Sequence, residues 1–359
     1  MPGSVPEPAA SEGTGRGEEA VPLGEAGLAD EAGAAGYRPL LFSIAYGMTG
    51  SVGDAEDIVQ DAFLGLAKAR RAGTVITSQK AYLTTAVTRL GINYLRSARV
   101  RRETYVGDWL PEPVVVPAGG SGHTGGAAGA AAFAGGSALA GRDAPAEHAE
   151  LADSLSMAFL VLLEALSPVE RAVFMLREVF GYGYPDIARI TGKTEVNCRQ
   201  IFTRARQRVT AGGPVPPGGR AAATRRAEGA ELARRFFAAA GGGDMDALLN
   251  LLAPDVVFHG DGGGKAQAVG QPLAGRERVG RLIGGLFRRG AMVGARVQPA
   301  WINGQPGAVT YDAAGLVVNV FALDIADGQV QAIRSVVNPD KLGHLGPVSN
   351  LARLPDKER

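Results

Sequence analysis

The stretch from Leu166 to Val209 constrains this chain most, because its caps, turns and charges all indicate the same local structure. Ser167 is a preferred N-cap residue, Pro168 suits the first helical position, and Glu170 completes a capping box. Apolar residues then recur at helical spacing. The pattern therefore predicts a short helix, which a pair of nearby glycines ends.

Two more helices are predicted in the same stretch. The first runs from Tyr184 to Ile190 and is closed by Gly192, a residue type that favours the left-handed C′ position. Thr194 can cap the second, which runs from Glu195 to Val209. Two helices joined by a glycine-containing turn are the signature of the helix-turn-helix, whose second helix enters the major groove of DNA.

The charges of this stretch agree with nucleic-acid binding. The chain has a formal net charge of only +1, so a local basic excess is informative. Between residues 189 and 208 a single acid, Glu195, faces the basic residues Arg189, Lys193, Arg199, Arg204, Arg206 and Arg208. The alternative is a solvated helical face without a partner. The residues that we expect to contact DNA from the third helix are Glu195, Asn197, Arg199, Gln200, Arg204 and Arg206.

Length and composition limit the other possibilities. A chain of 359 residues favours two or three domains. Its single cysteine excludes an internal disulfide and fits a reducing cytoplasm. No stretch is a convincing membrane-spanning helix, and the four scattered histidines have no metal-ligand spacing, so we expect no cofactor. Residues 1–35 read as a disordered acidic tail.

Residues 36–107 are predicted to form a helical domain, with one helix on each side of the Gly50 break and two more around a connector at residues 73–78. An acidic helix start follows the first break, which suits the helix dipole. It is either a solvated helix end or a docking face for a basic partner, and spacing alone leaves both open. The residues concerned are Asp54, Glu56, Asp57, Gln60 and Asp61.

The last helix of this domain carries arginines on one side and an apolar stripe on the other. Arginine interleaved with asparagine and tyrosine suits single-stranded nucleic acid, because aromatic rings stack on bases while arginine holds phosphates. A basic helix resting on a core is the simpler alternative. The residues that we expect to contact nucleic acid are Arg89, Asn93, Arg96, Arg99, Arg101 and Arg102.

Together, the motifs Leu40–Tyr46, Asp54–Asp61 and Arg89–Tyr105 resemble domain 2 of bacterial extracytoplasmic-function sigma factors, and residues 166–209 resemble their domain 4. The resemblance implies core RNA polymerase, through its β′ and β subunits, and promoter DNA as partners. It also implies that the acidic helix docks on the β′ coiled coil, that the basic helix holds the opened −10 strand, and that the helix-turn-helix reads the −35 element.

Three short motifs resemble those of a sigma-factor subgroup with a C-terminal SnoaL-like extension. The resemblance implies that the extension regulates the sigma factor in cis, through contact with domain 2 or the linker. The first motif has rigid prolines around an aromatic-apolar pair that we expect to be exposed and to need a groove; a plain linker is the alternative. The residues are Trp109, Leu110, Pro111, Glu112 and Pro113; Asp261, Gly262, Gly263, Gly264 and Lys265; and Asn338, Pro339, Asp340, Lys341 and Leu342.

The predicted order is therefore a multidomain one: all-α domains 2 and 4, then an α+β domain that resembles the cone-shaped SnoaL fold. In its region helices come first, and alternating strands then predict a curved antiparallel sheet. After the first domain, the expected segments are a linker at 108–150 with a Gly/Ala-rich part, domain 4 at 151–212, a linker at 213–224, the SnoaL-like domain at 225–345 and a tail at 346–359.

The sequence offers two alternative functions. His259 and Asp261 could form an acid–base pair, but no nucleophile or metal cluster accompanies them, so we expect no enzyme. The chain could also be a ligand-responsive helix-turn-helix regulator that is not a polymerase subunit. Such a regulator has no need of the acidic and basic helices in residues 37–105. We also expect no stripe of basic residues on the surface of the SnoaL-like region.

Overall fold

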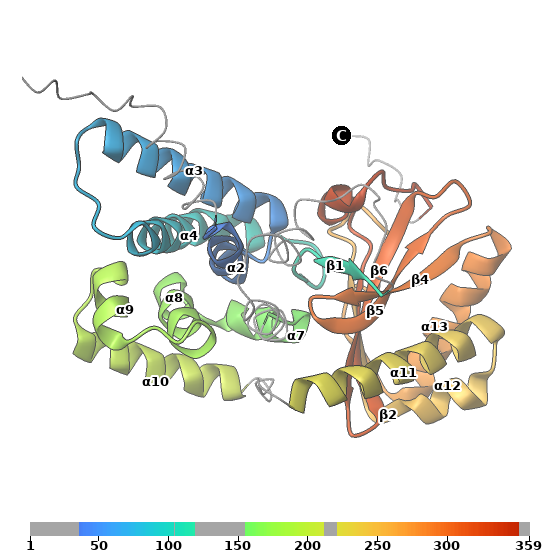
Figure 1. Cartoon of the computed structure of the whole chain (residues 1–359). Helices are drawn as coiled ribbons and strands as arrows, with labels where there is room; N and C mark the ends of the chain where they lie inside the picture. The colour runs from blue at the N-terminus through green and yellow to red at the C-terminus, as the bar shows by residue number, and fades with distance from the viewer. Residues whose placement is uncertain (1–35, 104, 119–154, 212–220, 352–359) are drawn as a thin grey trace, which may run out of the picture.

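The computed structural model describes residues 36–103, 105–118, 155–211 and 221–351, without the side chains of residues 98–103 and 221–226. It has a helical lobe and an α/β lobe that lie side by side (Figure 1). The expected N-terminal tail, most of the Gly/Ala-rich linker and the C-terminal end of the chain lie outside the described residues.

The first three helices form the N-terminal part of the helical lobe. They are α2 (Arg38–Thr49), α3 (Val52–Arg71) and α4 (Gln79–Glu103). Gly50 ends α2 in the left-handed region, at φ 68°, and Ser51 caps α3 by accepting a hydrogen bond from the backbone of Asp54. The second and third of the four expected helices are in fact one, α3, because nothing interrupts its apolar stripe.

The helix-turn-helix completes the helical lobe. A short helix, α7 (Met157–Leu162), leads into a 3₁₀ turn and then a helical core of α8 (Pro168–Phe174), α9 (Tyr184–Thr191) and α10 (Glu195–Ala211). A π-helical turn follows α8 at Met175–Val179. Buried apolar residues from α2, α3, α4, α8 and α10 belong to one core, so the two sigma-like units pack as a single body.

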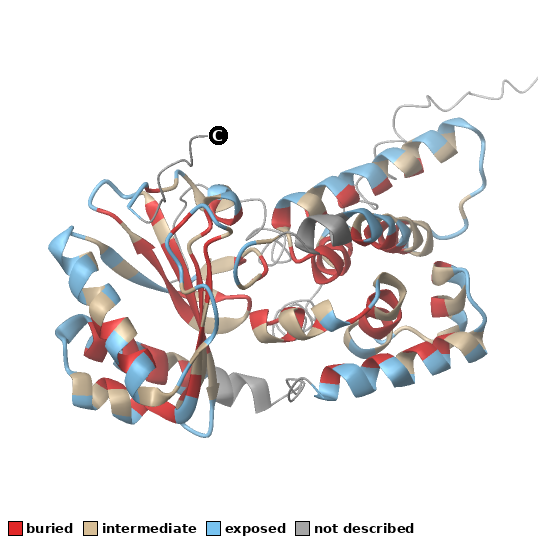
Figure 2. Cartoon of the chain, turned by 180° about the vertical axis from the view of Figure 1, so that it is seen from behind, coloured by how far each residue is buried: buried red, intermediate tan, exposed pale blue. Residues whose placement is uncertain are grey.

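The second lobe is a curved sheet covered by helices on one face. Its strands run in the order β1-β4-β5-β6-β7-β2-β3. Helices α11 (Ala221–Gly242), α12 (Met245–Leu251) and α13 (Arg276–Met292) cover one face (Figures 1 and 2). The strands are β1 (Val115–Pro117), β2 (Leu252–Asp261), β3 (Leu273–Ala274), β4 (Arg296–Ile302), β5 (Gln305–Tyr311), β6 (Val317–Ala326) and β7 (Gln329–Val336).

Three sequence expectations for this lobe need correction. The sheet is mixed rather than antiparallel, because β2 pairs in parallel with β7. Helix α11 begins at Ala221, inside the expected linker. Strand β1 comes from the segment expected to be the linker at 108–150, and it extends the sheet by pairing with β4. Its three residues are too few to produce an alternating pattern in the sequence.

Candidate nucleic-acid and polymerase interfaces and their link to the C-terminal domain

The helix-turn-helix is built by the caps that the sequence predicts. The Ser167 side chain accepts from the backbone of Glu170, and the Glu170 carboxylate accepts from the backbone of Ser167, at 3.4 and 3.0 Å. Gly192 closes α9 at φ 67°. Thr194 accepts from the backbone of Asn197 at 3.2 Å and so caps α10. These bonds set where each helix starts and ends.

One face of α10 packs inward and the other is open. Cys198 and Ala205 are fully buried. Exposed side chains on the outer face line a shallow hollow, namely Arg199, Gln200, Thr203 and Arg204. Arg206 is exposed as well, and Asn197 is half-buried. Glu195 forms an ion pair with Arg199 at 3.5 Å, so this predicted base-reading pair is held within the helix.

The acidic start of α3 divides into inward and outward residues. The Asp54 carboxylate accepts a hydrogen bond from the Tyr94 hydroxyl at 2.5 Å and so braces α3 against α4. Glu56 is half-buried, whereas Asp57, Gln60 and Asp61 are exposed. The surface available to a partner is therefore smaller than the predicted set, and its centre lies around Asp57 and Asp61.

The basic residues of α4 also have different surroundings. Arg89 donates to the backbone oxygens of Ile190 and Arg189 at the end of α9, at 2.9 and 3.2 Å. Asn93 and Arg96 are exposed. The side chains of Arg99, Arg101 and Arg102 lie outside the described residues. Cationic groups stabilise a helix C-terminus, so Arg89 here fastens α4 to the helix-turn-helix.

The extended segment 105–118 runs between the two lobes, and Asp261 organises its first half. The carboxylate of Asp261 is fully buried and accepts from the Leu110 backbone at 2.8 Å, from the Lys341 ammonium at 2.7 Å, and from the Tyr105 hydroxyl. Burial, and secondly the charge of Asp261, raises the pKa of the Tyr105 hydroxyl. This hydroxyl is therefore a donor.

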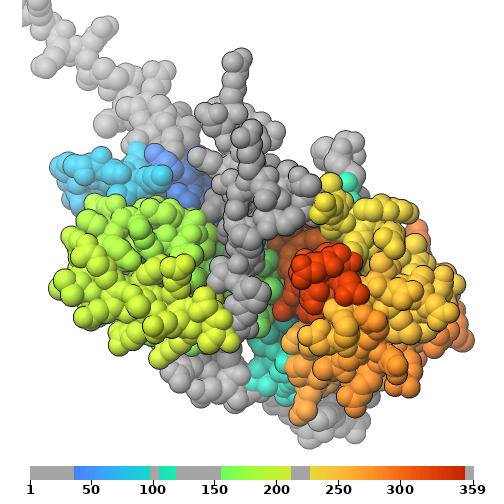
Figure 3. Space-filling view, turned by 90° about the horizontal axis from the view of Figure 1, so that it is seen from below, coloured from blue at the N-terminus to red at the C-terminus, as the bar shows by residue number. Residues whose placement is uncertain are grey.

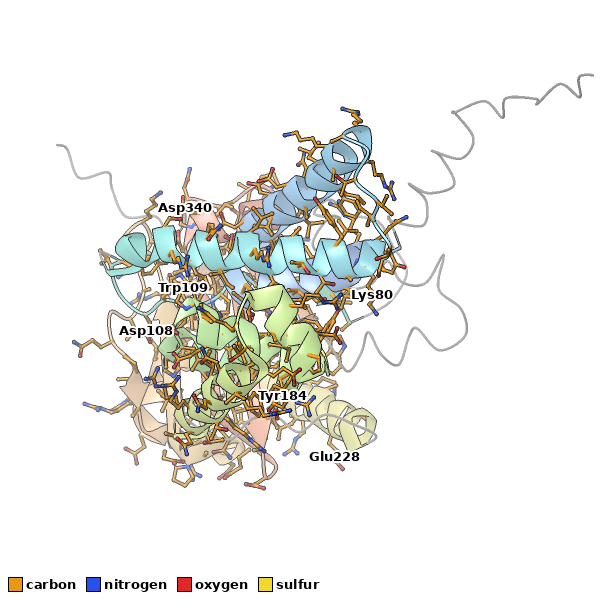
Figure 4. All side chains as sticks on the ribbon, turned by 90° about the vertical axis from the view of Figure 1, so that its left-hand side faces the viewer. Lys80, Asp108, Trp109, Tyr184, Glu228 and Asp340 are labelled. Atoms are coloured by element: carbon orange, nitrogen blue, oxygen red, sulfur yellow. The ribbon has the colours of Figure 1, made fainter. Side chains whose placement is uncertain are left out.

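Lys341 fills the space between the segment and the sheet. Its ammonium donates to the backbone oxygen of Leu110 at 2.5 Å and lies 4.4 Å from the centre of the Trp109 ring and 4.8 Å from that of Tyr105. A buried cation is tolerated when it is paired and faces aromatic rings. Figure 4 labels Asp108, Trp109 and Asp340, which lie along one side of the molecule.

The glycines of the second motif allow the backbone close approaches. Gly263 and Gly264 have φ values of 57° and 71°, and a Cβ on Gly263 would lie 2.2 Å from the Asn338 amide. Asn338 donates to the Tyr105 hydroxyl at 2.8 Å, and Lys265 pairs with Asp340 at 2.5 Å on the surface. The three motifs expected to act together thus meet at one place.

The second half of the segment binds the N-terminal helices. The Glu112 carboxylate accepts from the backbone of Val52 at 2.7 Å and so caps α3, while its backbone oxygen accepts from the Tyr46 hydroxyl at 2.5 Å. The Asn303 amide of the α/β lobe donates to the same hydroxyl at 2.7 Å. Burial raises the pKa of Tyr46. One hydroxyl therefore joins domain 2, the segment and the C-terminal domain.

The exposure expected for Trp109 and Leu110 is wrong in part. Trp109 is half-buried, and Leu110 is 2% exposed, packed with Met157 of α7 against the sheet face that the helices leave open. Pro111 and Pro113 are buried as well. The groove that the aromatic-apolar pair was expected to need is this sheet face.

His259 and Asp261 do not form an acid–base pair with each other. His259 contacts Asp108 at 2.9 Å, whereas Asp261 pairs with Lys341. Burial, as the largest cause, lowers the pKa of His259. In the described ranges, no group of three or more His, Cys, Asp and Glu residues could hold a metal ion. No helix among these residues is long and apolar enough to span a membrane.

Comparison with known proteins identifies each lobe. Residues 34–101 match Sigma-70 region 2, residues 156–209 match Sigma-70 region 4, and residues 233–337 match the SnoaL-like domain. The ECF RNA polymerase sigma factor SigJ of Mycobacterium tuberculosis is 38% identical over 312 residues, which cover 85% of this chain and 90% of that protein.

Two further comparisons agree. The probable ECF RNA polymerase sigma factor SigI of the same species is 31% identical, over 86% of this chain and 93% of SigI. The crystal structure of SigJ superposes with a TM-score of 0.64 and 32% identity, covering 89% of this chain and all of that one. The chain therefore belongs to the ECF RNA polymerase sigma factors, in a form that carries a SnoaL-like domain after domains 2 and 4.

Proposed function

We propose that the helical lobe uses three surfaces in transcription initiation. The exposed Asp57, Gln60 and Asp61 dock on core RNA polymerase. Helix α4 holds the opened −10 strand through the exposed Asn93 and Arg96, and α10 reads the −35 element through Arg199 and Gln200. The support is the exposure of these side chains on helices whose packing is otherwise complete. Family membership favours this role over that of a regulator outside the polymerase.

We further propose that the SnoaL-like domain holds the sigma domains in a closed, inactive arrangement. The names −10 and −35 place the two elements about 25 base pairs apart, which is about 85 Å of duplex at 3.4 Å per base pair. Domains 2 and 4 share one hydrophobic core and therefore cannot both reach their elements in this arrangement. That shared core is the observation that carries the proposal.

The chain has the reach to open. Residues 119–154 connect the two sigma domains, and a segment of this length spans up to about 120 Å when extended. Residues 105–118 are the lock, because the Asp261 carboxylate holds the first half and the Tyr46 hydroxyl holds the second half. Releasing this segment removes the contacts that it makes with both lobes.

The test replaces Tyr46 by Phe, which removes the shared hydroxyl and keeps the ring. The loss removes the acceptor of the shorter hydrogen bond of the buried Asn303 amide and leaves the longer one to the Leu155 backbone oxygen, so the closed form should be destabilised by about 1–3 kcal/mol. Opening is measured by energy transfer between dyes at Lys68→Cys and Gln207→Cys, with Cys198→Ala, before and after core polymerase is added. We expect Tyr46→Phe to open at lower polymerase concentration.

The matched control is Tyr82→Phe in α4, because the Tyr82 hydroxyl makes no hydrogen bond in the described part of the chain. It should behave like the parent protein. Equal opening curves for Tyr46→Phe, Tyr82→Phe and the parent would contradict the lock. A reversal of Asp57 and Asp61 to Lys that leaves polymerase binding unchanged would contradict the docking surface separately.

A further inference from the structure

Helix α13 of the SnoaL-like domain presents arginines on the side that faces away from the sheet. Val279 and Ile283 are fully buried against the core. At 3.6 residues per turn, the exposed arginines lie within about 100° of the helix circumference and extend over about 17 Å. They are Arg278, Arg281, Arg288 and Arg289.

None of these four arginines forms an ion pair within the residues that the structure describes. Other exposed arginines do, for example Arg189 with Asp186 and Arg234 with Glu231. Glu277 is the one acid in α13. The interpretation that this domain has no basic stripe is therefore wrong. The stripe is hard to recognise in the sequence, because about two turns of small and apolar residues separate Arg281 from Arg288.

The residue type indicates the kind of ligand. All four cations are arginines, whose planar guanidinium groups bind phosphate oxygens through two parallel hydrogen bonds. A row of phosphates along a nucleic-acid strand offers repeated acceptors of this geometry. Four uncompensated charges on one face also attract a polyanion, and each neutralised phosphate releases counterions.

The covalent connection keeps the SnoaL-like domain near DNA that α10 contacts. Helix α10 ends at Ala211 and α11 begins at Ala221, so the connection spans at most about 35 Å, or about ten base pairs. Helix α13 packs on α11 and α12 and moves with them. The limit holds whether the lobes are closed or open. Figure 3 shows the green helix-turn-helix on the left and the yellow-to-orange helices of this domain on the right of the same face.

We propose that Arg278, Arg281, Arg288 and Arg289 bind the phosphate backbone of the duplex beside the segment contacted by α10. The SnoaL-like domain then adds sequence-independent affinity for DNA. This inference rests on the proposed DNA contact of α10, and the experiment below separates the two.

The experiment measures binding of the full-length protein to a fluorescein-labelled 40-base-pair duplex of random sequence, by anisotropy, over a range of KCl concentrations. The test variant is Arg278→Gln/Arg281→Gln/Arg288→Gln/Arg289→Gln, and the control carries Lys at the same four positions. The slope of log Kobs against log [KCl] should fall by about 0.9 for each lost contact, hence by up to about 3.6. The Lys control should keep the parent slope.

A second variant separates the two surfaces. Arg204→Gln/Arg206→Gln should lower the slope on the same duplex. An unchanged slope for the α13 Gln variant overturns the inference. If the α13 variant lowers the slope and the α10 variant does not, the inference holds and the assignment of α10 fails.

Discussion

Arg171 shows how a single buried charge joins the two sigma domains. Its side chain is 1% exposed, donates to the backbone oxygen of Gly47 at 3.1 Å, and pairs with Glu164 at 2.6 Å. Gly47 has no Cβ at a point where one would meet the side chain of Met175. The glycine thus allows the close helix approach that brings its carbonyl within reach of the guanidinium.

We predict that Arg171→Ala destabilises the protein by about 2–4 kcal/mol. The substitution leaves a cavity and removes one ion-pair partner of a carboxylate that is itself mostly buried. Because Glu164 is about a quarter exposed, the cost should stay below the full penalty of an unpaired buried charge. Urea denaturation measures the difference.

The control for this prediction is Arg189→Ala. Arg189 forms an exposed pair with Asp186 three residues earlier, which should contribute less than about 0.5 kcal/mol. If both variants lose the same stability, the buried pair has no special role. The double variant Arg171→Met/Glu164→Leu should recover part of the loss, because apolar residues of similar volume often replace a buried ion pair well.

At the scale of elements, α8 starts the helix-turn-helix and also contacts α10. Glu170 of its capping box accepts from Arg208 of α10 at 2.8 Å. The residue that completes the cap of α8 therefore also holds the C-terminal end of α10.

We predict that Ser167→Ala costs about 1 kcal/mol, since the backbone of Glu170 loses its acceptor. Thermal denaturation followed by circular dichroism measures the loss. Ser167→Asp keeps an acceptor at the N-cap and should retain most of the stability. A stability equal to the parent in the alanine variant would show that water replaces the cap without cost.

For the whole molecule, the closed arrangement depends on contacts between residues far apart in the sequence. The Tyr105 hydroxyl contacts Asp261, and Asn303 contacts Tyr46, across 156 and 257 residues. His259 adds a contact with Asp108 at 2.9 Å. Burial is the largest cause that lowers the pKa of this imidazole below 6.5; Arg334 lowers it further and Asp108 partly opposes the shift.

We predict that acid opens the molecule. A lowered pKa means that the closed form favours neutral His259, so this contribution is complete above pH 6.5 and decreases as pH falls below it. Energy transfer between the dyes on domains 2 and 4 should therefore decrease from pH 7.5 to pH 5.5. His259→Gln should remove this pH dependence in part. If the energy transfer of this variant changes with pH as in the parent protein, the prediction is contradicted.

Much of the helical lobe and the chemistry of its outer faces follows from the sequence. The caps at Ser167 and Thr194, the turn at Gly192 and the apolar period of α10 act within a few residues of each other, so local patterns predict them. The outward direction of Arg199 and Gln200 follows from the same period. The three motifs resemble those of the subgroup with a SnoaL-like extension, and this resemblance indicates that they act together. It does not indicate which atoms make the contacts.

Other features depend on contacts that no local pattern contains. Arg89 looks like a nucleic-acid contact in the sequence but donates to the end of α9, and Leu110 looks exposed but lies against the sheet. Strand β1 pairs with the edge of β4, and β2 pairs in parallel with β7 although four strands and a helix separate them in the chain. The burial, strand pairing and charge contacts of such residues depend on partners far away in the sequence, so only the tertiary structure determines them.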